Sequence, residues 1–324
     1  MSEWKTYKLG DLIECIIDNR GKSAPISISN YQPIIEINAL GQREVNYDVI
    51  RKYVSKETYD TWFRAGHPKI GDILFSTVGT IGLTSLMTQD VGCIAQNIIA
   101  LRVNDKLLNN QYLYYFLNNK TTKINLNNLN IGGVQPSIKL PHLLNMPISL
   151  PPLAEQKRIA DILSAIDDKI ELNRRINANL EQQAQALFDE YFIHNIGKLG
   201  NYSTASLTDI AQFLNGLAMQ KFRPKGNEDG IPVLKIKELG QGKCDASSDL
   251  CSSIPEEYII NNGDIVFSWS GTLLVDIWCS GICGLNQHLF KVSPLNYPKW
   301  LIYFWTKYHL SNFIRIAQDK AVTM

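Results

Sequence analysis

The sequence predicts an α+β protein in which two similar mixed α/β domains, residues 1–150 and 196–324, flank one long helix at residues 151–195. Three observations support this organisation. One stretch has helical periodicity and no interior helix breaker. The residues before it and after it resemble each other. Each of the two copies combines strand patterns, glycine turns and one amphipathic helix pattern.

The long helix is predicted from the stretch Pro151 to Ile193, which contains no glycine and has prolines only at its first two positions. His194, Asn195 and Gly197 then supply stop signals. At ~1.5 Å per residue this helix would be roughly 60 Å long. Its apolar residues form a narrow, near-heptad stripe, and a polar Asn173 in such a seam is typical of a helix whose register with a partner is specified. We therefore expect a coiled-coil-like spacer, whose pairing residues are Ile159, Leu163, Ile166, Ile170, Asn173, Ile176, Leu180 and Leu187. The alternative is a long core helix of a single domain.

The internal repeat begins with Gly71–Ser76 (GDILFS), which returns as Gly263–Ser268 (GDIVFS). Further matches follow in the same order, with only small drifts in offset. They are Leu9–Leu12 with Leu207–Ile210, Ile34–Ile37 with Val233–Ile236, Gly79-Thr80 with Gly271-Thr272, Gln96-Asn97 with Gln287-His288, and Leu113–Phe116 with Leu301–Phe304. Ordered self-similarity of this kind indicates a duplicated domain.

Within the first copy, GDILFS predicts a strand, and the turn at Gly79-Thr80 predicts a hairpin whose second strand is Ile81 to Met87. A further strand is predicted at Asn97 to Val103 and an amphipathic helix at Gln111 to Leu117. Asp72 and Asp264 are interpreted as turn residues rather than catalysts, because Gly-Asp before a strand is ordinary turn chemistry. The aromatic clusters are interpreted as core.

The composition, 45% hydrophobic and 19% charged with a net charge of +1, is that of an ordinary globular protein. No signal-peptide pattern or long apolar run is present, so we expect a cytoplasmic protein with no membrane contact. The six cysteines form no C-x-x-C pair and the five histidines stand apart, so no metal site is expected. No P-loop, zinc-protease, nucleophile-elbow or methyltransferase motif occurs, and we expect a non-catalytic protein.

Several segments together resemble type I restriction–modification specificity subunits. The most specific is Leu150–Ala160 (LPPLAEQKRIA), followed by the long helix. The other segments are Trp4 with Leu9–Leu12, Gly71–Ser76 with Gly79-Thr80, and Gln135–Ile138. The resemblance implies a subunit with two target-recognition domains that read a bipartite site in double-stranded DNA. It also implies docking of modification (methyltransferase) subunits and, through the complex, of a motor–endonuclease subunit. This chain would bind no cofactor; S-adenosylmethionine, ATP and Mg would belong to the partners.

The sequence departs from that family pattern in one respect. The second copy ends at Met324, near the counterpart of Ile131 to Val134, so the second spacer helix that such proteins usually carry is missing from it. We expect the second recognition domain to be incomplete at this end, and the exposed first helix to favour self-association.

Candidate DNA-binding residues are polar residues on expected loops and strand ends, since Arg, Lys, Asn and Gln read major-groove edges and contact phosphates. In the first domain they are Arg20, Lys22, Asn38, Arg43, Arg64, Thr77, Thr80, Gln96 and Gln135, and in the second Lys221, Arg223, Lys225, Lys237, Lys243, Trp269, Thr272 and Gln287.

Three functions remain open from the sequence. The first is the specificity subunit of a restriction system. The second is the reading end of a single-chain methyltransferase–nuclease, for which a catalytic motif would be the discriminating feature. The third is a helix-mediated homodimeric interaction protein or a dormant recognition-domain cassette.

Overall fold

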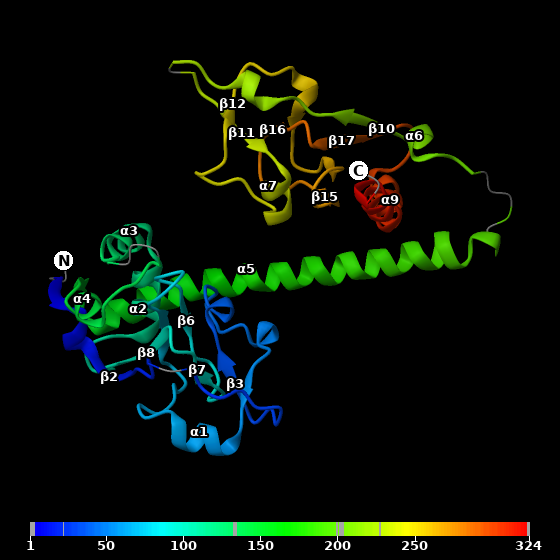
Figure 1. Ribbon diagram of the computed structural model, residues 1–324. Coiled ribbons are helices and arrows are strands. Elements are labelled where there is room, and N and C mark those ends of the chain that lie inside the picture. The colour runs from blue at the N-terminus through cyan, green and yellow to red at the C-terminus, as the bar shows by residue number, and fades with distance from the viewer. Residues whose placement is uncertain are drawn as a thin grey trace. The chain divides into compact units, whose positions relative to one another are not determined.

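The computed structural model describes residues 4–21, 23–131, 135–198, 200, 204–226 and 228–322. The chain divides into two compact units, unit 1 (Met1–Ile176) and unit 2 (Asn177–Met324), and the division falls within the long helix α5 (Leu153–Phe188) (Figure 1). Helices and sheets occur in both units, which confirms the predicted α+β class with two sheet-rich parts and a long helix.

Unit 1 contains an antiparallel sheet with strand order β2-β8-β5-β6. Its strands are β2 (Ile13–Ile17), β8 (Ile98–Val103), β5 (Ile73–Ser76) and β6 (Thr84–Leu86). A second sheet has the order β4-β3-β7, in which β3 (Gln32–Ile35) lies antiparallel to β4 (Tyr53–Val54) and parallel to β7 (Cys93–Ile94). A short ribbon pairs β1 (Lys5–Lys8) with β9 (Pro147–Leu150), so the ends of the first repeat copy are joined.

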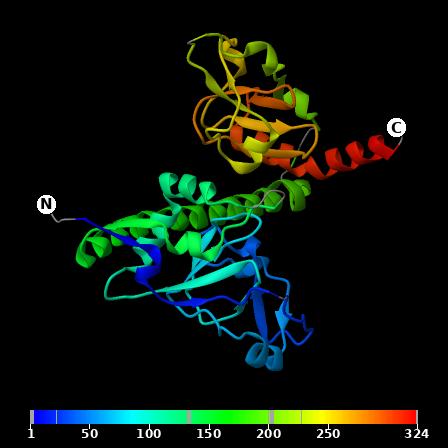
Figure 2. The ribbon, with the colours of Figure 1, turned by 60° about the vertical axis from the view of Figure 1, so that its left-hand side comes forward.

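The helices of unit 1 preceding α5 are α1 (Lys56–Trp62), α2 (Asn110–Asn118), α3 (Lys120–Asn128) and α4 (Leu140–Leu144). Asn109 and Asn119 cap α2 and α3 by accepting hydrogen bonds from Tyr112 N and Thr122 N. One face of α2 is buried against the sheet and joins the main core of the unit (Figure 2). The aromatic residues of α2 are therefore core residues, as interpreted from the sequence.

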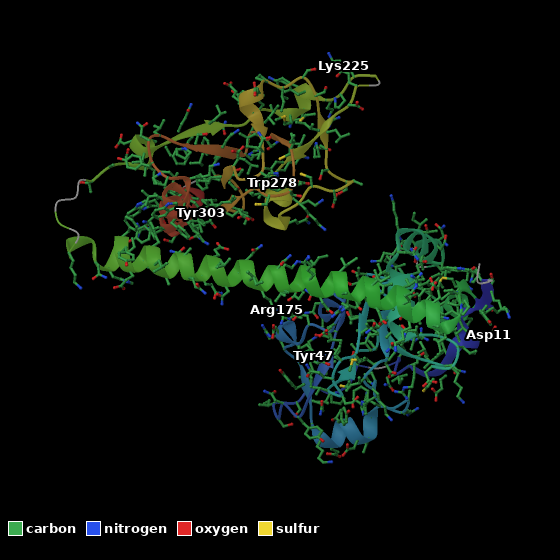
Figure 3. All side chains as sticks on the ribbon, turned by 180° about the vertical axis from the view of Figure 1, so that it is seen from behind. Asp11, Tyr47, Arg175, Lys225, Trp278 and Tyr303 are labelled. Atoms are coloured by element: carbon green, nitrogen blue, oxygen red, sulfur yellow. The ribbon has the colours of Figure 1, made fainter. Side chains whose placement is uncertain are left out.

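Unit 2 repeats this plan. One sheet has the order β10-β17-β14-β15, formed by β10 (Ala211–Asn215), β17 (Leu289–Pro294), β14 (Ile265–Ser268) and β15 (Leu274–Ile277). The other has the order β12-β11-β16-β13, formed by β12 (Leu250–Cys251), β11 (Ile231–Leu234), β16 (Cys283–Leu285) and β13 (Ile259–Ile260). The helices are α6 (Leu207–Ile210), α7 (Ile236–Gln241), α8 (Lys299–Tyr308) and α9 (Leu310–Val322). Trp278 is fully buried in this unit, and its indole N–H donates to Gly281 O over 2.6 Å (Figure 3).

Strand register confirms the duplication. Phe75 of β5 lies opposite Ile99 of β8, and Phe267 of β14 lies opposite Phe290 of β17. In both units the GDI(L/V)FS strand also forms the predicted hairpin, β5 with β6 and β14 with β15. The predicted third strand and the amphipathic helix correspond to β8 and α2.

Helix α5 starts at Leu153, directly after Pro151 and Pro152, because proline cannot supply a backbone donor inside a helix. It spans 36 residues and continues as a π-helical turn at Asp189–His194. Ala160 is buried in the core of unit 1 and Phe188 in the core of unit 2. Among the described residues, no helix is both long and apolar enough to cross a membrane.

Candidate nucleic-acid interface

Polar side chains of unit 1 gather at the ends of two parallel strands. Glu36 follows β3, and Gln96 follows β7. Ile35 and Ile94 are register partners, and Ala95 N donates to Ile35 O over 3.0 Å, so both strands end at the same sheet edge. Beside this edge lies a cavity of about 230 Å³, and its polar lining consists of Asn19, Ser23, Glu36, Lys52, Gln96 and Asn97.

The hairpin turn after β5 reaches the same edge. Gly79 has a φ of +84°, and a Cβ built on it would lie 3.6 Å from Ile37 Cδ1 and 4.0 Å from Gln135 Nε2. Glycine is suited to this left-handed backbone, and the turn lies within van der Waals range of Ile37 and Gln135. Gly79 N also donates to Pro136 O over 2.9 Å, so the turn with the exposed Thr80 lies next to Gln135 and to the segment that carries Asn38.

Thr77, another candidate in this turn, has no exposed surface, and its hydroxyl donates to Asn97 O over 3.3 Å. Its backbone N–H donates to the same oxygen over 2.9 Å. Thr77 thus anchors the turn to the loop after β7 rather than presenting a side chain to a ligand.

Two arginine candidates lie on neighbouring loops. Arg20 pairs with Asp18, and this hydrogen bond lowers the pKa of the Asp18 carboxyl. Arg64 is exposed in the turn after α1, where Asn19 Oδ1 accepts a hydrogen bond from Ala65 N. The asparagine joins the two arginine-bearing segments. The candidate Lys22 lies outside the described residues.

Unit 2 has an equivalent edge, formed where β11 and β16 end side by side. Asn286 N donates to Leu234 O over 3.2 Å, which corresponds to the bond between Ala95 and Ile35 in unit 1. A Cβ on Gly271 would lie 3.4 Å from Ile236 Cδ1, so the hairpin turn again meets the segment after the central strand. Of the predicted residues, this edge carries Lys237, Trp269, Thr272 and Gln287.

The remaining candidates of unit 2 are Lys221, Arg223, Lys225 and Lys243, all of them exposed. The hydrogen bond and charge of Lys235 lower the pKa of the Asp249 carboxyl, and the nearby charge of Arg223 adds a smaller effect. Trp269, which is 43% exposed, donates its indole N–H to Asn215 Oδ1 over 3.0 Å. Its ring is therefore held in place at the surface.

The aspartates of the repeated Gly-Asp pairs have a structural role that sequence reasoning only partly anticipated. Asp72 accepts from Lys69 N as a turn residue, and it also forms a two-pronged ion pair with Arg102 at 2.8 and 2.9 Å. Asp264 accepts from Asn261 N and pairs with Lys291 at 3.1 Å. In each unit the cation lies on the strand adjacent to the Gly-Asp strand. The pairing depends on strand register, which the sequence alone does not give.

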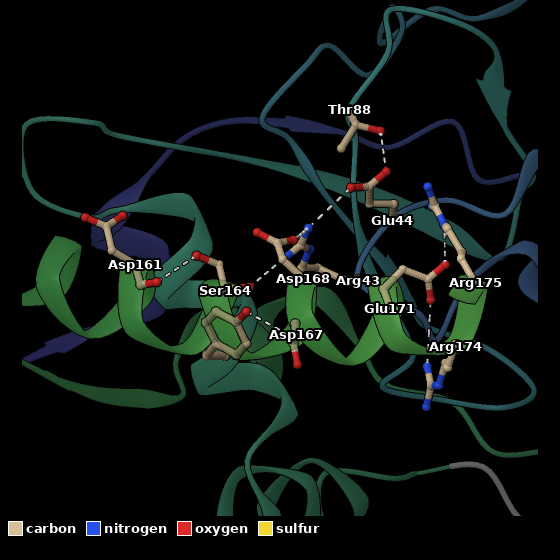
Figure 4. A network of polar contacts seen from close by, with 11 residues as sticks. Arg43, Glu44, Thr88, Asp161, Ser164, Asp167, Asp168, Glu171, Arg174 and Arg175 are labelled. Carbon is tan, nitrogen blue, oxygen red and sulfur yellow. Dashed lines mark hydrogen bonds and ion pairs between the residues drawn. The ribbon is translucent and has the colours of Figure 1, made fainter. Parts of the chain in front are cut away.

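Arg43 does not line the cavity at the strand-end edge; it contacts helix α5. Its guanidinium pairs with the Asp168 carboxylate and donates to Ser164 O over 3.2 Å (Figure 4). On the same helix, Asp167 accepts a 2.8 Å hydrogen bond from the Tyr115 hydroxyl of α2. Burial and this carboxylate raise the pKa of the Tyr115 hydroxyl. These contacts fasten the first domain to the helix.

Helix α5 is fastened in a similar way within unit 2. Tyr303 of α8 donates to Glu181 Oε1 over 2.8 Å, and Lys307 pairs with the same oxygen at 2.5 Å. The bond from Lys307, followed by that from Tyr303, lowers the pKa of the Glu181 carboxyl. Phe188 stacks on Phe304 of α8 with ring centroids 5.4 Å apart.

Gln156, in the LPPLAEQ motif, is a buried anchor that the sequence analysis did not single out. Its side chain is 1% exposed. Gln156 Oε1 accepts from Asn109 N at the start of α2 over 3.0 Å. Gln156 Nε2 donates to Leu107 O and Pro151 O over 3.1 and 3.0 Å. The available signal was its position on one helix face between the apolar residues Leu153 and Ile159.

The predicted stripe of α5 is only partly covered. Ile159 packs against the core of unit 1, contrary to the expectation that it faces a partner helix, and Leu163 is half-buried. The other stripe residues are exposed: Ile166, Ile170, Asn173, Ile176, Leu180 and Leu187. An apolar surface of this kind is typical of an interaction site.

Unit 1 and unit 2 thus carry polar loops at equivalent sheet edges, and each unit contains part of helix α5. The family model described as "Type I restriction modification DNA specificity domain" matches residues 1–182. The chain belongs to this family of DNA specificity proteins.

Individual proteins similar to this chain are named as specificity subunits. The HindI specificity subunit of Haemophilus influenzae is 29% identical over 203 residues, which is 60% of this chain and 41% of that protein. The MjaIX specificity subunit of Methanocaldococcus jannaschii is 28% identical over 271 residues, 73% of this chain and 62% of that protein. The chain thus spans less than two thirds of either relative. The crystal structure of an S subunit from M. genitalium shares the fold, with a TM-score of 0.55 at 16% identity, over 98% of this chain and 80% of that one.

Proposed function

We propose that this chain is the DNA-sequence-specificity subunit of a type I restriction–modification system and that it reads a bipartite site in double-stranded DNA. The observation that carries the proposal is the repeated edge: in each unit, the loops after two parallel strands and one glycine hairpin turn carry polar side chains. They include Asn38, Thr80 and Gln96 in unit 1, and Lys237, Thr272 and Gln287 in unit 2. Such groups read major-groove edges and contact phosphates. Two edges in one chain suit a site of two half-sites.

In this proposal the exposed face of α5 takes part in docking the modification (methyltransferase) subunits. The carboxylates on the helix disfavour contact with phosphates, whereas the exposed apolar stripe favours a protein partner. The chain itself has no catalytic role and binds no cofactor. S-adenosylmethionine, ATP and Mg act in the modification and motor–endonuclease subunits, and the complex works in the cytoplasm.

The test is methyl transfer to DNA by the chain alone, by modification subunits alone and by the two together. We expect S-adenosylmethionine-dependent methylation of one split sequence by the mixture only. Methyl transfer by the chain alone, or methylation without sequence preference by the mixture, would contradict the proposal.

A second candidate is favoured by the exposed stripe of α5, because two copies of the chain could cover it by antiparallel pairing. This is the helix-mediated homodimeric interaction protein, or a dormant recognition-domain cassette without a working restriction complex. It predicts a stable dimer that neither binds modification subunits nor gains from them any sequence-specific DNA binding. Size-exclusion chromatography with and without these subunits, followed by DNA binding of each peak, separates the two candidates.

A further inference from the structure

In both units an ion pair lies at the strand-end edge, where β3 and β7 end in unit 1 and β11 and β16 end in unit 2; this edge is called the reading edge below. The two ion pairs occupy equivalent backbone positions, but the acidic and the basic residue have changed places. In unit 1, Lys52 Nζ lies 2.7 Å from Glu36 Oε1. In unit 2, Lys235 pairs with Asp249. Glu36 is the residue after β3, and Lys235 is the residue after its counterpart β11.

Backbone hydrogen bonds establish that the positions are equivalent. Ile34 N donates to Lys52 O over 2.8 Å, and Val233 N donates to Asp249 O over 2.7 Å. Pro33 pairs with Tyr53, and Pro232 pairs with Leu250, in the antiparallel partner strands. Glu36 therefore corresponds to Lys235, and Lys52 corresponds to Asp249.

The fold does not explain which residue carries which charge. All four side chains are at least one-third exposed, and surface pairs of this kind contribute little to folding. The same backbone also accommodates either polarity. What differs between the two units is then the pattern of donor and acceptor that each presents at its surface.

That surface is the candidate reading edge. Glu36, Lys52 and Gln96 line one cavity in unit 1. In unit 2, Lys235 follows Leu234, whose carbonyl binds the backbone of the residue preceding Gln287. Each ion pair also keeps free bonding capacity, since a carboxylate has about four lone-pair sites and an ammonium has three donors.

In the major groove, a G·C pair presents the N4 amino donor of cytosine beside the O6 and N7 acceptors of guanine. A carboxylate next to an ammonium is complementary to this pattern. Building on the proposed DNA-reading function, we propose that each ion pair reads one G·C base pair. The carboxylates of Glu36 and Asp249 accept from cytosine, and the ammonium groups of Lys52 and Lys235 donate to guanine. Because the acidic and basic residues have changed places, the carboxylate and the ammonium lie at swapped backbone positions in the two units. Each unit therefore reads its G·C pair in the opposite orientation relative to the backbone of that unit.

The test uses the full chain assembled with modification subunits and a randomised double-stranded DNA library. The wild-type complex should enrich a split sequence with a G·C pair in each half. The double variant Glu36→Lys/Lys52→Glu should reverse the orientation of that pair in one half only. The variant Lys235→Asp/Asp249→Lys should reverse it in the other half. Each reversal should change the preference at that position by on the order of tenfold or more, the usual effect of one mismatched pair.

A matched control is Lys56→Asp/Asp60→Lys, which exchanges an exposed ion pair of 2.8 Å on α1 and should leave the enriched sequence unchanged. Glu36→Gln keeps the side-chain shape and should relax the discrimination at the same position. Thermal melting of each variant is the check that it is folded.

An unchanged sequence in the folded double variants overturns the proposal, while the proposed function stands. Equal loss of affinity for all sequences also overturns it and assigns the lysines to phosphates. Absence of any enriched sequence with the wild-type complex overturns the proposed function and this inference together.

Discussion

The Tyr115 hydroxyl donates to Asp167 Oδ2 of helix α5 over 2.8 Å. Tyr303, its counterpart in the sequence repeat, donates to Glu181 of the same helix over the same distance. In both units, a tyrosine on the helix that follows β8 or β17 thus donates a hydrogen bond to a carboxylate of α5. The duplication has preserved the way in which a domain is attached to the helix as well as the fold of the domain.

Removing the Tyr115 hydroxyl should weaken this attachment. We expect Tyr115→Phe to lower the free energy of unfolding of unit 1 by about 1 kcal/mol, the usual net contribution of one hydrogen bond. Chemical denaturation measures the change. A double-mutant cycle with Asp167→Ala isolates the pairwise energy. Tyr191→Phe, at an exposed position, is the control. Additive effects of the two substitutions would show that the hydrogen bond contributes nothing.

Alkaline pH should destabilise both attachments. Burial, followed by the neighbouring carboxylate, raises the pKa of Tyr115 and of Tyr303 above the ordinary value of 10.0. A phenol whose pKa is raised in the folded state contributes stability that is fully present below about pH 10 and is lost as the pH rises through the folded-state pKa. The free energy of unfolding, measured from about pH 8 to about pH 11, should therefore fall as the pH rises. It should fall less in Tyr115→Phe and Tyr303→Phe than in the wild type. Identical pH profiles for the variants and the wild type would contradict this assignment.

Gln156 should be important for folding, because its buried side chain bonds three backbone groups. Gln156→Leu leaves Asn109 N and two carbonyl oxygens without their partner. An unsatisfied buried polar group costs about 1–3 kcal/mol, so we expect destabilisation of that order or more. Gln182→Leu makes the same substitution at an exposed position of α5 and should change the unfolding free energy little. Equal effects of the two variants would refute the anchoring role.

Under the proposed function, unit 1 and unit 2 should read DNA independently, since each unit has its own core clusters. Replacing residues 1–150 by a related recognition domain should change one half of the methylated sequence and leave the other half as it was. Methylation mapping of the assembled complex gives the answer. A change in both halves would show that the domains are coupled.

The uncovered stripe of α5 should promote association. Leu180 is 57% exposed. At roughly 25 cal/mol per Å², covering a few hundred Å² of apolar surface would contribute several kcal/mol. We expect the chain alone to be an oligomer or poorly soluble, and we expect modification subunits to relieve this. Leu180→Asp should reduce association in sedimentation experiments, whereas Gln182→Asp should not. A soluble monomer indifferent to Leu180→Asp would refute the prediction.

Much of the fold followed from local patterns. The helical period from Ile159 to Phe188 and the two opening prolines located α5, because periodicity and helix-breaking residues act through neighbouring turns of the chain. The hairpin of β5 and β6 followed from Gly79, whose positive φ is a local requirement of the turn. The repeat then predicted the second unit from the first.

Tertiary structure decided which side chains meet. Arg43 appears in the sequence as one more cation, but its partner Asp168 lies more than a hundred residues further along the chain. Thr77 looks like a surface turn residue, yet packing buries it. The exchanged ion pairs of Glu36 with Lys52 and of Lys235 with Asp249 emerge only when strand register aligns them. The physical reason is that a periodic pattern specifies the face of an element, whereas a partner across a sheet or a helix is specified by register and packing.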